Sequence, residues 1–203
     1  MPVDLDTPKL LLVRPQQSST IDLAVLQGLW TAELYLKLSD QTNQLIEFTA
    51  GSIEVLAMPT RRHQVILLFL YELLKAVLVG GKVLVAPMRL QVYPNKFREP
   101  DILLLRDRDD PRNQEAFWLG ADLVVEIVSP DDPERDTVVK RGDYAEAGIP
   151  EYWIVNPNDS TITVLTLVAD HYLVHGNFAC GETATSQLLP GFAVEVAAVF
   201  DAV

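Results

Sequence analysis

Cysteine is almost missing from this chain of 203 residues, since Cys180 is the only one. A single cysteine excludes an intramolecular disulfide framework and a zinc site built on several thiolates. Long hydrophobic runs are also missing: the longest, residues 65–79, is 15 residues long and contains Glu72 and Lys75. It is short for a membrane-spanning helix, which needs about 20 apolar residues. Because the first six residues are acidic where a secretion signal would be basic, we expect a cytoplasmic protein with no membrane partner.

Positive charge is scarce and unevenly placed. The chain has 16 Lys and Arg against 28 Asp and Glu, a net charge of −12. Residues 142–203 contain no Lys or Arg, whereas residues 61–141 hold 13 of the 16 cations. A net negative chain repels nucleic acid at long range, so the total charge argues against DNA binding. Any anionic ligand is expected to bind in the middle of the chain.

Several common motifs are absent. No GxGxxG and no GxSxG occurs, and Gly81-Lys82 lacks both the upstream glycine and the following Ser or Thr of a phosphate loop. His171 and His175 are four residues apart but lie in a segment that reads as a strand, so they are not a helical zinc pair. These absences leave other kinds of site to consider.

The pattern of apolar residues predicts an α/β (α+β) protein with a mixed sheet flanked by helices. Residues 1–30 form a variable N-terminal segment, with a strand at 9–13 and a loop at 16–20, and residues 31–203 form a single domain. Thr31 and Thr60 are expected to cap helices that reach about Leu38 and Val79. The second of these helices is apolar nearly all round, which favours burial in the core or against a second copy in a homodimer. The remaining expected elements are a hairpin at 44–48 and 52–57, a helix from 131 to Gly148, and strands at 83–86, 89–93, 100–105, 123–128, 152–155, 161–167 and 171–174.

Two carboxylates stand where the strand pattern calls for apolar residues. Glu126 lies in the middle of the apolar run 123–128, where an unpaired charge costs several kcal/mol. It could sit on a solvated face or pair with an arginine, or its charge could be balanced by a bound cation or serve proton transfer. Asp101 opens the next apolar run and could be ordinary turn chemistry. Two carboxylates on neighbouring strands could also share a divalent cation, and Mg²⁺ favours such sites.

Two further groups of polar residues flank these carboxylates. Asp136, Lys140 and Tyr144 follow each other at intervals of four on an expected helix, so they share one face. That spacing by itself is typical of a surface ion pair with an aromatic neighbour. His63 follows two arginines at the start of a helix, where cations and backbone N–H groups would suit a phosphate. A solvated helix end is the alternative.

These residues resemble the Uma-type putative restriction-endonuclease family, a group of bacterial proteins of unknown function abundant in cyanobacteria. The similarity covers about residues 31–200 and includes residues 45–51 and Pro59-x-x-x-His63. It rests mainly on four blocks of sequence: Pro100-Asp101, Leu123-Val-Val-Glu126-Ile-Val-Ser129-Pro130, Asp136-x-x-x-Lys140, and Tyr144-Ala-Glu-Ala-Gly148-Ile-Pro-Glu-Tyr-Trp153. The family belongs to the PD-(D/E)xK nuclease superfamily. The resemblance therefore implies a restriction-endonuclease-like mixed sheet with helices on its faces and a Mg²⁺-dependent phosphodiesterase site.

The resemblance also implies roles for individual residues. Asp101 and Glu126 would bind Mg²⁺ or Mn²⁺ together with the backbone carbonyl of Ile127. The catalytic lysine, which usually follows the Glu by two residues, would instead be Lys140 on the next helix, because Val128 occupies the usual position. Glu47, His63, Asp136 and Tyr144 are the expected auxiliary residues.

The expected function is that of a metal-dependent endonuclease, with DNA the more expected substrate than RNA. Two alternatives stay open: a catalytically silent binding or assembly protein that keeps the nuclease fold, and a hydrolase of another phosphoester. A fold by itself does not establish an activity.

Overall fold

The computed structural model describes residues 9–14, 17–130 and 132–202, with side chains from residue 24 onwards. The chain forms two compact units. The N-terminal unit comprises Met1–Met58 and Pro94–Phe97, and the main unit comprises Pro59–Tyr93 and Arg98–Val203. The single domain predicted over residues 31–203 thus includes residues of both units.

The N-terminal unit begins with an antiparallel hairpin of β1 (Lys9–Arg14) and β2 (Gln17–Asp22), followed by a 3₁₀ turn, Leu23–Leu26. The strand expected at 9–13 is confirmed, but the loop expected at 16–20 is wrong from residue 17 on. Pairing with β1 supplies backbone hydrogen bonds that outweigh the weak strand preference of Gln17-Ser-Ser.

Helix α1 (Ala32–Ser39) begins after Thr31, whose side chain accepts a hydrogen bond from the Leu34 amide, as predicted. The predicted hairpin is also present as β3 (Ile46–Thr49) and β4 (Ser52–Val55). Gly51, in the turn between them, has a φ of 94°, and its carbonyl accepts hydrogen bonds from the amides of Gly28 and Trp30. A Cβ there would lie 2.8 Å from the Gly28 carbonyl oxygen, so the close approach requires glycine.

A small aromatic core holds the N-terminal unit together. The rings of Tyr35 and Phe48 stack with their centres 5.4 Å apart, and Phe97 on β7 (Lys96–Arg98) lies 5.3 Å from Tyr35. The Tyr35 hydroxyl donates to the carbonyl of Ile46 at 2.9 Å. Strand β7, which the sequence pattern did not predict, is only three residues long and pairs with β3 through Phe97 and Phe48.

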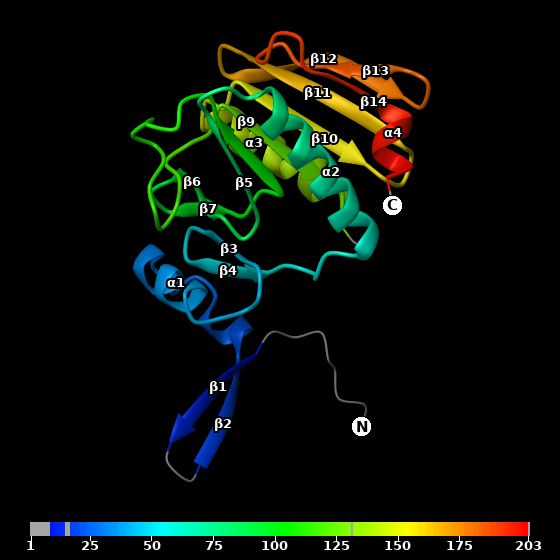
Figure 1. Ribbon diagram of the computed structural model, residues 1–203. Helices are drawn as coiled ribbons and strands as arrows, with labels where there is room; N and C mark the ends of the chain where they lie inside the picture. The colour runs from blue at the N-terminus through cyan, green and yellow to red at the C-terminus, as the bar shows by residue number, and fades with distance from the viewer. Residues whose placement is uncertain (1–8, 15–16, 131, 203) are drawn as a thin grey trace. The chain divides into compact units, whose positions relative to one another are not determined.

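The main unit is built on a six-stranded sheet of order β12-β11-β10-β9-β8-β5 (Figure 1). Strands β9 and β10 are parallel, and every other neighbouring pair is antiparallel. The strands are β5 (Lys82–Val85), β8 (Ile102–Leu105), β9 (Leu123–Ile127), β10 (Glu151–Asn156), β11 (Thr161–Val168) and β12 (His171–Ala179). Five of them match predicted strands to within two residues at each end, and β12 extends five residues beyond the predicted 171–174. Together with the helices below, they confirm the predicted mixed sheet flanked by helices.

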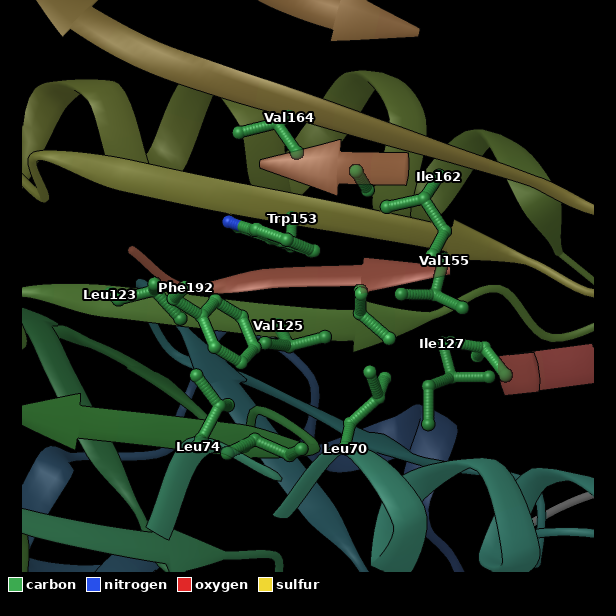
Figure 2. Close-up of a cluster of buried hydrophobic side chains, with 14 of the residues drawn as sticks. Leu70, Leu74, Leu123, Val125, Ile127, Trp153, Val155, Ile162, Val164 and Phe192 are labelled. Atoms are coloured by element: carbon green, nitrogen blue, oxygen red, sulfur yellow. The ribbon is translucent and has the colours of Figure 1, made fainter. Parts of the chain in front are cut away.

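Each face of this sheet has its own hydrophobic core. One core contains Leu123, Val125 and Ile127 of β9 and lies against α2 (Arg61–Val77) and α4 (Val196–Phe200) (Figure 2). The other contains the alternate residues Val124 and Val128 and lies against α3 (Lys140–Glu146). Since successive side chains of a strand point to opposite faces, Glu126 must lie on the α3 side. It is therefore a carboxylate in a position that the strand otherwise fills with valine.

Helix α2 starts where predicted, with the Thr60 hydroxyl accepting from the His63 amide at 3.2 Å, but it ends at Val77. The main unit does not bury this helix all round, and burial of its other side against a second copy stays a prediction. The helix buries the face that carries Ile66, Leu67, Leu70 and Leu74, whereas Leu68 is 53% exposed. Phe69, Tyr71 and Leu73 are partly buried and pack against the same core, so one wide side of the helix faces the sheet and the opposite side is exposed.

The predicted helix from 131 to Gly148 is helical from Pro133 onwards, and residue 131 lies outside the described residues. The helix then forms a π-helical turn, Arg135–Val139, in which the Lys140 amide donates to the carbonyl of Arg135. It continues as α3 and stops before Gly148, whose φ of 71° fits the predicted left-handed end. Single π turns often occur at functional sites.

The remaining elements of the main unit are β6 (Leu90–Tyr93), which was predicted, and three that were not: β13 (Thr183–Thr185), β14 (Ala193–Glu195) and α4. The unpredicted elements have three to five residues, too few to show a periodic pattern. Within the described part of the chain, no helix is long and apolar enough to cross a membrane.

Candidate active site

Asp101 and Glu126 lie at neighbouring positions on two adjacent strands of the main unit. Ile102 of β8 pairs with Val125 of β9 in an antiparallel register. Continued by one residue, this register sets Asp101, which directly precedes β8, opposite Glu126. Directly opposed residues of antiparallel strands point to the same face of the sheet. Asp101 also accepts a hydrogen bond from the backbone N–H of Ile127, 2.7 Å from its Oδ2 atom. The three residues predicted as metal ligands therefore occupy adjoining positions on the two strands, and their metal-binding role stays a prediction.

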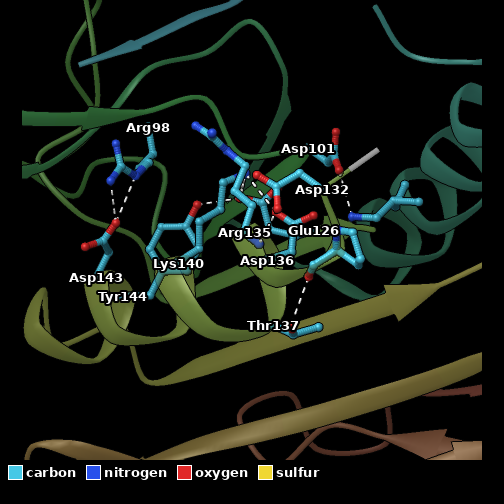
Figure 3. A network of polar contacts seen from close by, with 12 residues as sticks. Arg98, Asp101, Glu126, Asp132, Arg135, Asp136, Thr137, Lys140, Asp143 and Tyr144 are labelled. Carbon is cyan, nitrogen blue, oxygen red and sulfur yellow. Dashed lines mark hydrogen bonds and ion pairs between the residues drawn. The ribbon is translucent and has the colours of Figure 1, made fainter. Parts of the chain in front are cut away.

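The face of the helix that covers Glu126 carries the other predicted polar residues (Figure 3). The Lys140 ammonium lies 2.9 Å from Glu126 Oε1 and 3.1 Å from Asp136 Oδ1, so it forms ion pairs with both carboxylates. The Tyr144 hydroxyl donates to Glu126 Oε1 at 2.5 Å. The spacing of four residues thus places Asp136, Lys140 and Tyr144 in one cluster around Glu126, and this cluster is buried rather than on the surface.

Burial strengthens the electrostatic interactions within this cluster. The side chains of Glu126 and Lys140 are 3% and 5% exposed, and a buried ion pair is screened far less than a surface pair. Tyr152 of β10 lies against the cluster and donates from its hydroxyl to the carbonyl of Asp136 at 2.8 Å. Burial, and next the negative charge of Glu126, raise the pKa of the Tyr152 phenol well above its ordinary value, so it stays a neutral donor.

Asp101 forms the more open side of the cluster. Its side chain is 14% exposed, and its Oδ2 atom lies 3.1 Å from Nε2 of His63, which is 16% exposed. His63 belongs to the first turn of α2, so the start of that helix reaches the site from the side opposite α3. His63 thus lies beside a predicted metal ligand and is largely buried, and its auxiliary role stays a prediction.

Glu47 belongs to the N-terminal unit, where it lies buried on β3. Its auxiliary role stays a prediction.

A buried ion pair that the sequence pattern did not predict supports the cluster. Both Nε and Nη2 of Arg98 donate to Oδ2 of Asp143, at 2.9 and 2.6 Å. Arg98 lies three residues before Asp101, and Asp143 lies between Lys140 and Tyr144 on α3. The pair therefore ties the segment before β8 to the helix that carries the lysine. The two residues are 45 positions apart, so no local pattern could have revealed the pairing.

Glu151 is a second buried carboxylate that the sequence pattern did not single out. It accepts hydrogen bonds from the Trp153 indole at 2.7 Å, the Ser186 hydroxyl at 2.6 Å and the amides of Gln187 and Leu188 at 2.8 Å. The signal that could have found it is a charged residue at the start of an apolar strand, the same signal that marked Asp101.

The chemistry of the donor set fits a magnesium or manganese ion with few protein ligands. Mg²⁺ is bound by one or two carboxylates and keeps several waters, and Asp101 and Glu126 supply two opposed carboxylates from neighbouring strands. Among the described residues, no group of three or more His, Cys, Asp or Glu side chains is placed to hold a metal ion. A site of this kind would therefore rely on the two carboxylates, a backbone carbonyl and water.

Comparisons with known proteins show the family and the fold of this chain. The profile of the Uma-type family, described as "putative restriction endonuclease", matches residues 32–197. A crystal structure of a putative nuclease from Anabaena variabilis superposes with a TM-score of 0.67 at 16% sequence identity, covering 81% of this chain and 96% of that one. At this identity the likeness shows a shared fold. Among curated proteins, none matches the chain. Since the family profile spans most of the sequence, the chain belongs to the Uma-type family of putative restriction endonucleases.

Proposed function

We propose that this protein is a metal-dependent endonuclease that hydrolyses phosphodiester bonds, in DNA rather than RNA. The observation that carries the proposal is the register that opposes Asp101 and Glu126, with the Lys140 ammonium 2.9 Å from Glu126. Two carboxylates for a divalent cation and one buried ammonium are the groups that hydrolysis of an anionic ester requires. Membership of a nuclease family supports the same reaction class.

Asp101 and Glu126 would hold Mg²⁺ or Mn²⁺ together with the Ile127 carbonyl. When bound, such an ion lowers the pKa of a coordinated water and offsets charge on the phosphoryl oxygens. The Ile127 N–H, by donating to Asp101, fixes the Asp101 carboxylate beside the strand that carries Glu126. The open side at Asp101 is where a phosphodiester can approach.

Lys140 would orient the attacking water and stabilise the negative charge that develops on the phosphoryl group. Its ammonium is held between Glu126 and Asp136, so its position is set before substrate binds. Tyr144 fixes Glu126 through its hydroxyl. Arg98 and Asp143 hold α3 in place, which makes them positioning residues in this scheme.

The test is incubation of the purified protein with plasmid, single-stranded DNA and RNA in Mg²⁺ or Mn²⁺. We expect the wild type to cleave DNA and the Lys140→Ala variant to lose cleavage while it still binds metal. Calorimetry should show that Asp101→Asn weakens metal binding. Turnover retained by Lys140→Ala, or Mn²⁺ binding unchanged in Asp101→Asn, would contradict the assigned roles.

The net charge of −12 favours one alternative, a catalytically silent protein that keeps the nuclease fold for binding or assembly. Binding of nucleic acid without cleavage in the same assay would select it, and cleavage of other phosphoesters alone would select a different hydrolase. A homodimer is also part of the proposal. Light scattering that shows a monomer at micromolar concentration would exclude it.

A further inference from the structure

The first turn of α2 carries three basic residues and no acid: Arg61, Arg62 and His63. The N-terminal end of a helix carries partial positive charge, so acidic side chains are favourable there and cations are unfavourable. The first turn of α2 therefore has the reverse of the favourable charge. An anion bound at this point would remove the conflict.

Arg61 and Arg62 are both exposed, and neither side chain has a hydrogen bond or ion pair with any residue that the structure describes. Other arginines of the main unit are engaged: Arg98 with Asp143, and Arg112 with two carboxylates. Lys37, Arg106 and Lys140 also have a carboxylate partner. Two adjacent arginines without one are therefore available to a ligand.

These arginines lie beside the candidate active site. His63, the next residue along the helix, places its Nε2 atom 3.1 Å from Asp101 Oδ2, on the more open side of the cluster. The other ring nitrogen of His63, Nδ1, is buried and has no hydrogen-bond partner among the described residues. Buried polar atoms without a partner are uncommon, and at binding sites a ligand or its water often supplies one.

We propose that Arg61 and Arg62 bind the phosphates of duplex DNA next to the phosphodiester that reaches Asp101. The inference rests on the proposed function, because it takes the substrate to be nucleic acid. Arginine presents a planar fork of donors that matches phosphate oxygens, and phosphate neutralisation supplies most non-specific affinity for DNA. The pair gives an acidic protein a local cationic contact beside the more open side of the candidate site.

The experiment measures binding of a labelled 30-base-pair duplex by fluorescence anisotropy in EDTA, so that no cleavage occurs, over a series of salt concentrations. The variant is Arg61→Ala/Arg62→Ala. The matched control is Arg106→Ala/Arg108→Ala, which also removes two exposed cations, beyond the end of β8 that lies away from Asp101. Each lost phosphate contact should lower the slope of log K against log salt by about one, so the variant slope should fall by about two. The control slope should stay near the wild-type value.

Several results would overturn the proposal: an unchanged slope in Arg61→Ala/Arg62→Ala, an equal fall in the control, or no duplex binding by the wild type. Tighter, arginine-dependent binding of RNA would overturn the assignment to DNA. Thermal unfolding checks the fold, and the variant should melt at the wild-type temperature or slightly above it because two unfavourable cations leave the helix start.

Plasmid cleavage in Mg²⁺, measured on the same preparations, separates this inference from the proposed function. Arginine-dependent binding without cleavage by the wild type would refute the nuclease and leave the phosphate contact standing. Cleavage with an arginine-independent salt slope would do the reverse.

Discussion

Glu126 and Glu151 are both buried, on adjacent parallel strands, but their surroundings differ in kind. Glu151 starts β10 on the face of α2 and is surrounded by neutral donors, an indole, a hydroxyl and two amides. Glu126 lies near the end of β9 on the face of α3, beside an ammonium, a phenol and the opposed Asp101.

The difference teaches that burial of a carboxylate does not by itself mark a site. Glu151 anchors the loop at residues 186–188 to the sheet, and all its donors come from the fold. Glu126 is tied to a cation that must be held in place and lies next to a second carboxylate on the more open side. The first arrangement is built for stability and the second suits catalysis. Substitutions at the two positions should therefore separate stability from activity.

The largest effect is expected from Glu151→Ala. It would leave a buried indole N–H and two backbone N–H groups without an acceptor, at a cost of about 3–5 kcal/mol in the free energy of unfolding. Urea unfolding followed by circular dichroism measures it. Glu182→Ala removes an exposed acid of the same unit and serves as the control, expected to change stability by about 1 kcal/mol or less. A loss below 1 kcal/mol in Glu151→Ala would contradict the anchoring role.

Glu126→Gln should have a smaller effect on stability and a large effect on cleavage. Its amide oxygen can still accept from Tyr144, and Lys140 keeps Asp136 as a partner, so the loss of stability should be smaller than in Glu151→Ala. Loss of the charge should reduce cleavage about 10²–10³-fold, the usual cost of removing one group that stabilises charge in a transition state. Cleavage assays and urea unfolding on the same protein check both parts. Full activity would remove Glu126 from the proposed site.

Tyr144→Phe should have an intermediate effect. It deletes one buried hydroxyl that donates to a carboxylate, at a cost of about 1.5–3 kcal/mol in stability. Because Lys140 still holds Glu126, cleavage should fall less than in Glu126→Gln. Tyr93→Phe is a matched control, since the Tyr93 hydroxyl donates to the carbonyl of Glu146 at an exposed position. Equal losses of stability in the two variants would show that the hydrogen bond to Glu126 stabilises the fold no more than the exposed one does.

The smallest effect is expected at a partly exposed ion pair, which contrasts with both buried acids. The hydrogen bonds from Arg112 lower the pKa of Asp110 to about 2 from its ordinary value of 3.8. A lowered folded-state pKa means that the stability from this pair is complete above about pH 4 and is lost as the pH falls towards 2. The difference in unfolding free energy between the wild type and Asp110→Asn should shrink over that interval. A difference that stays constant down to pH 2 would contradict the lowered pKa.

Much of this site could be predicted because helices and strands have regular periods that show in the local sequence. Residues four apart on a helix share a face, so Asp136, Lys140 and Tyr144 were expected to lie together, and they do. Alternation along β9 showed that Glu126 was out of place. The apolar residues all round α2 did not show which of its sides the main unit covers, because composition does not show how much of a helix its neighbours cover.

The sequence by itself determined the order of strands and helices and the polar face of the helix that carries Lys140, because both depend on residues that are close together in the chain. It also determined the uneven charge, which can be counted directly along the chain. The opposition of Asp101 to Glu126, the contact of His63 with Asp101 and the pair of Arg98 with Asp143 exist only in the folded chain. These contacts join residues 25 to 45 positions apart. Strand register and helix packing bring them together, and neither has a local signal in the sequence.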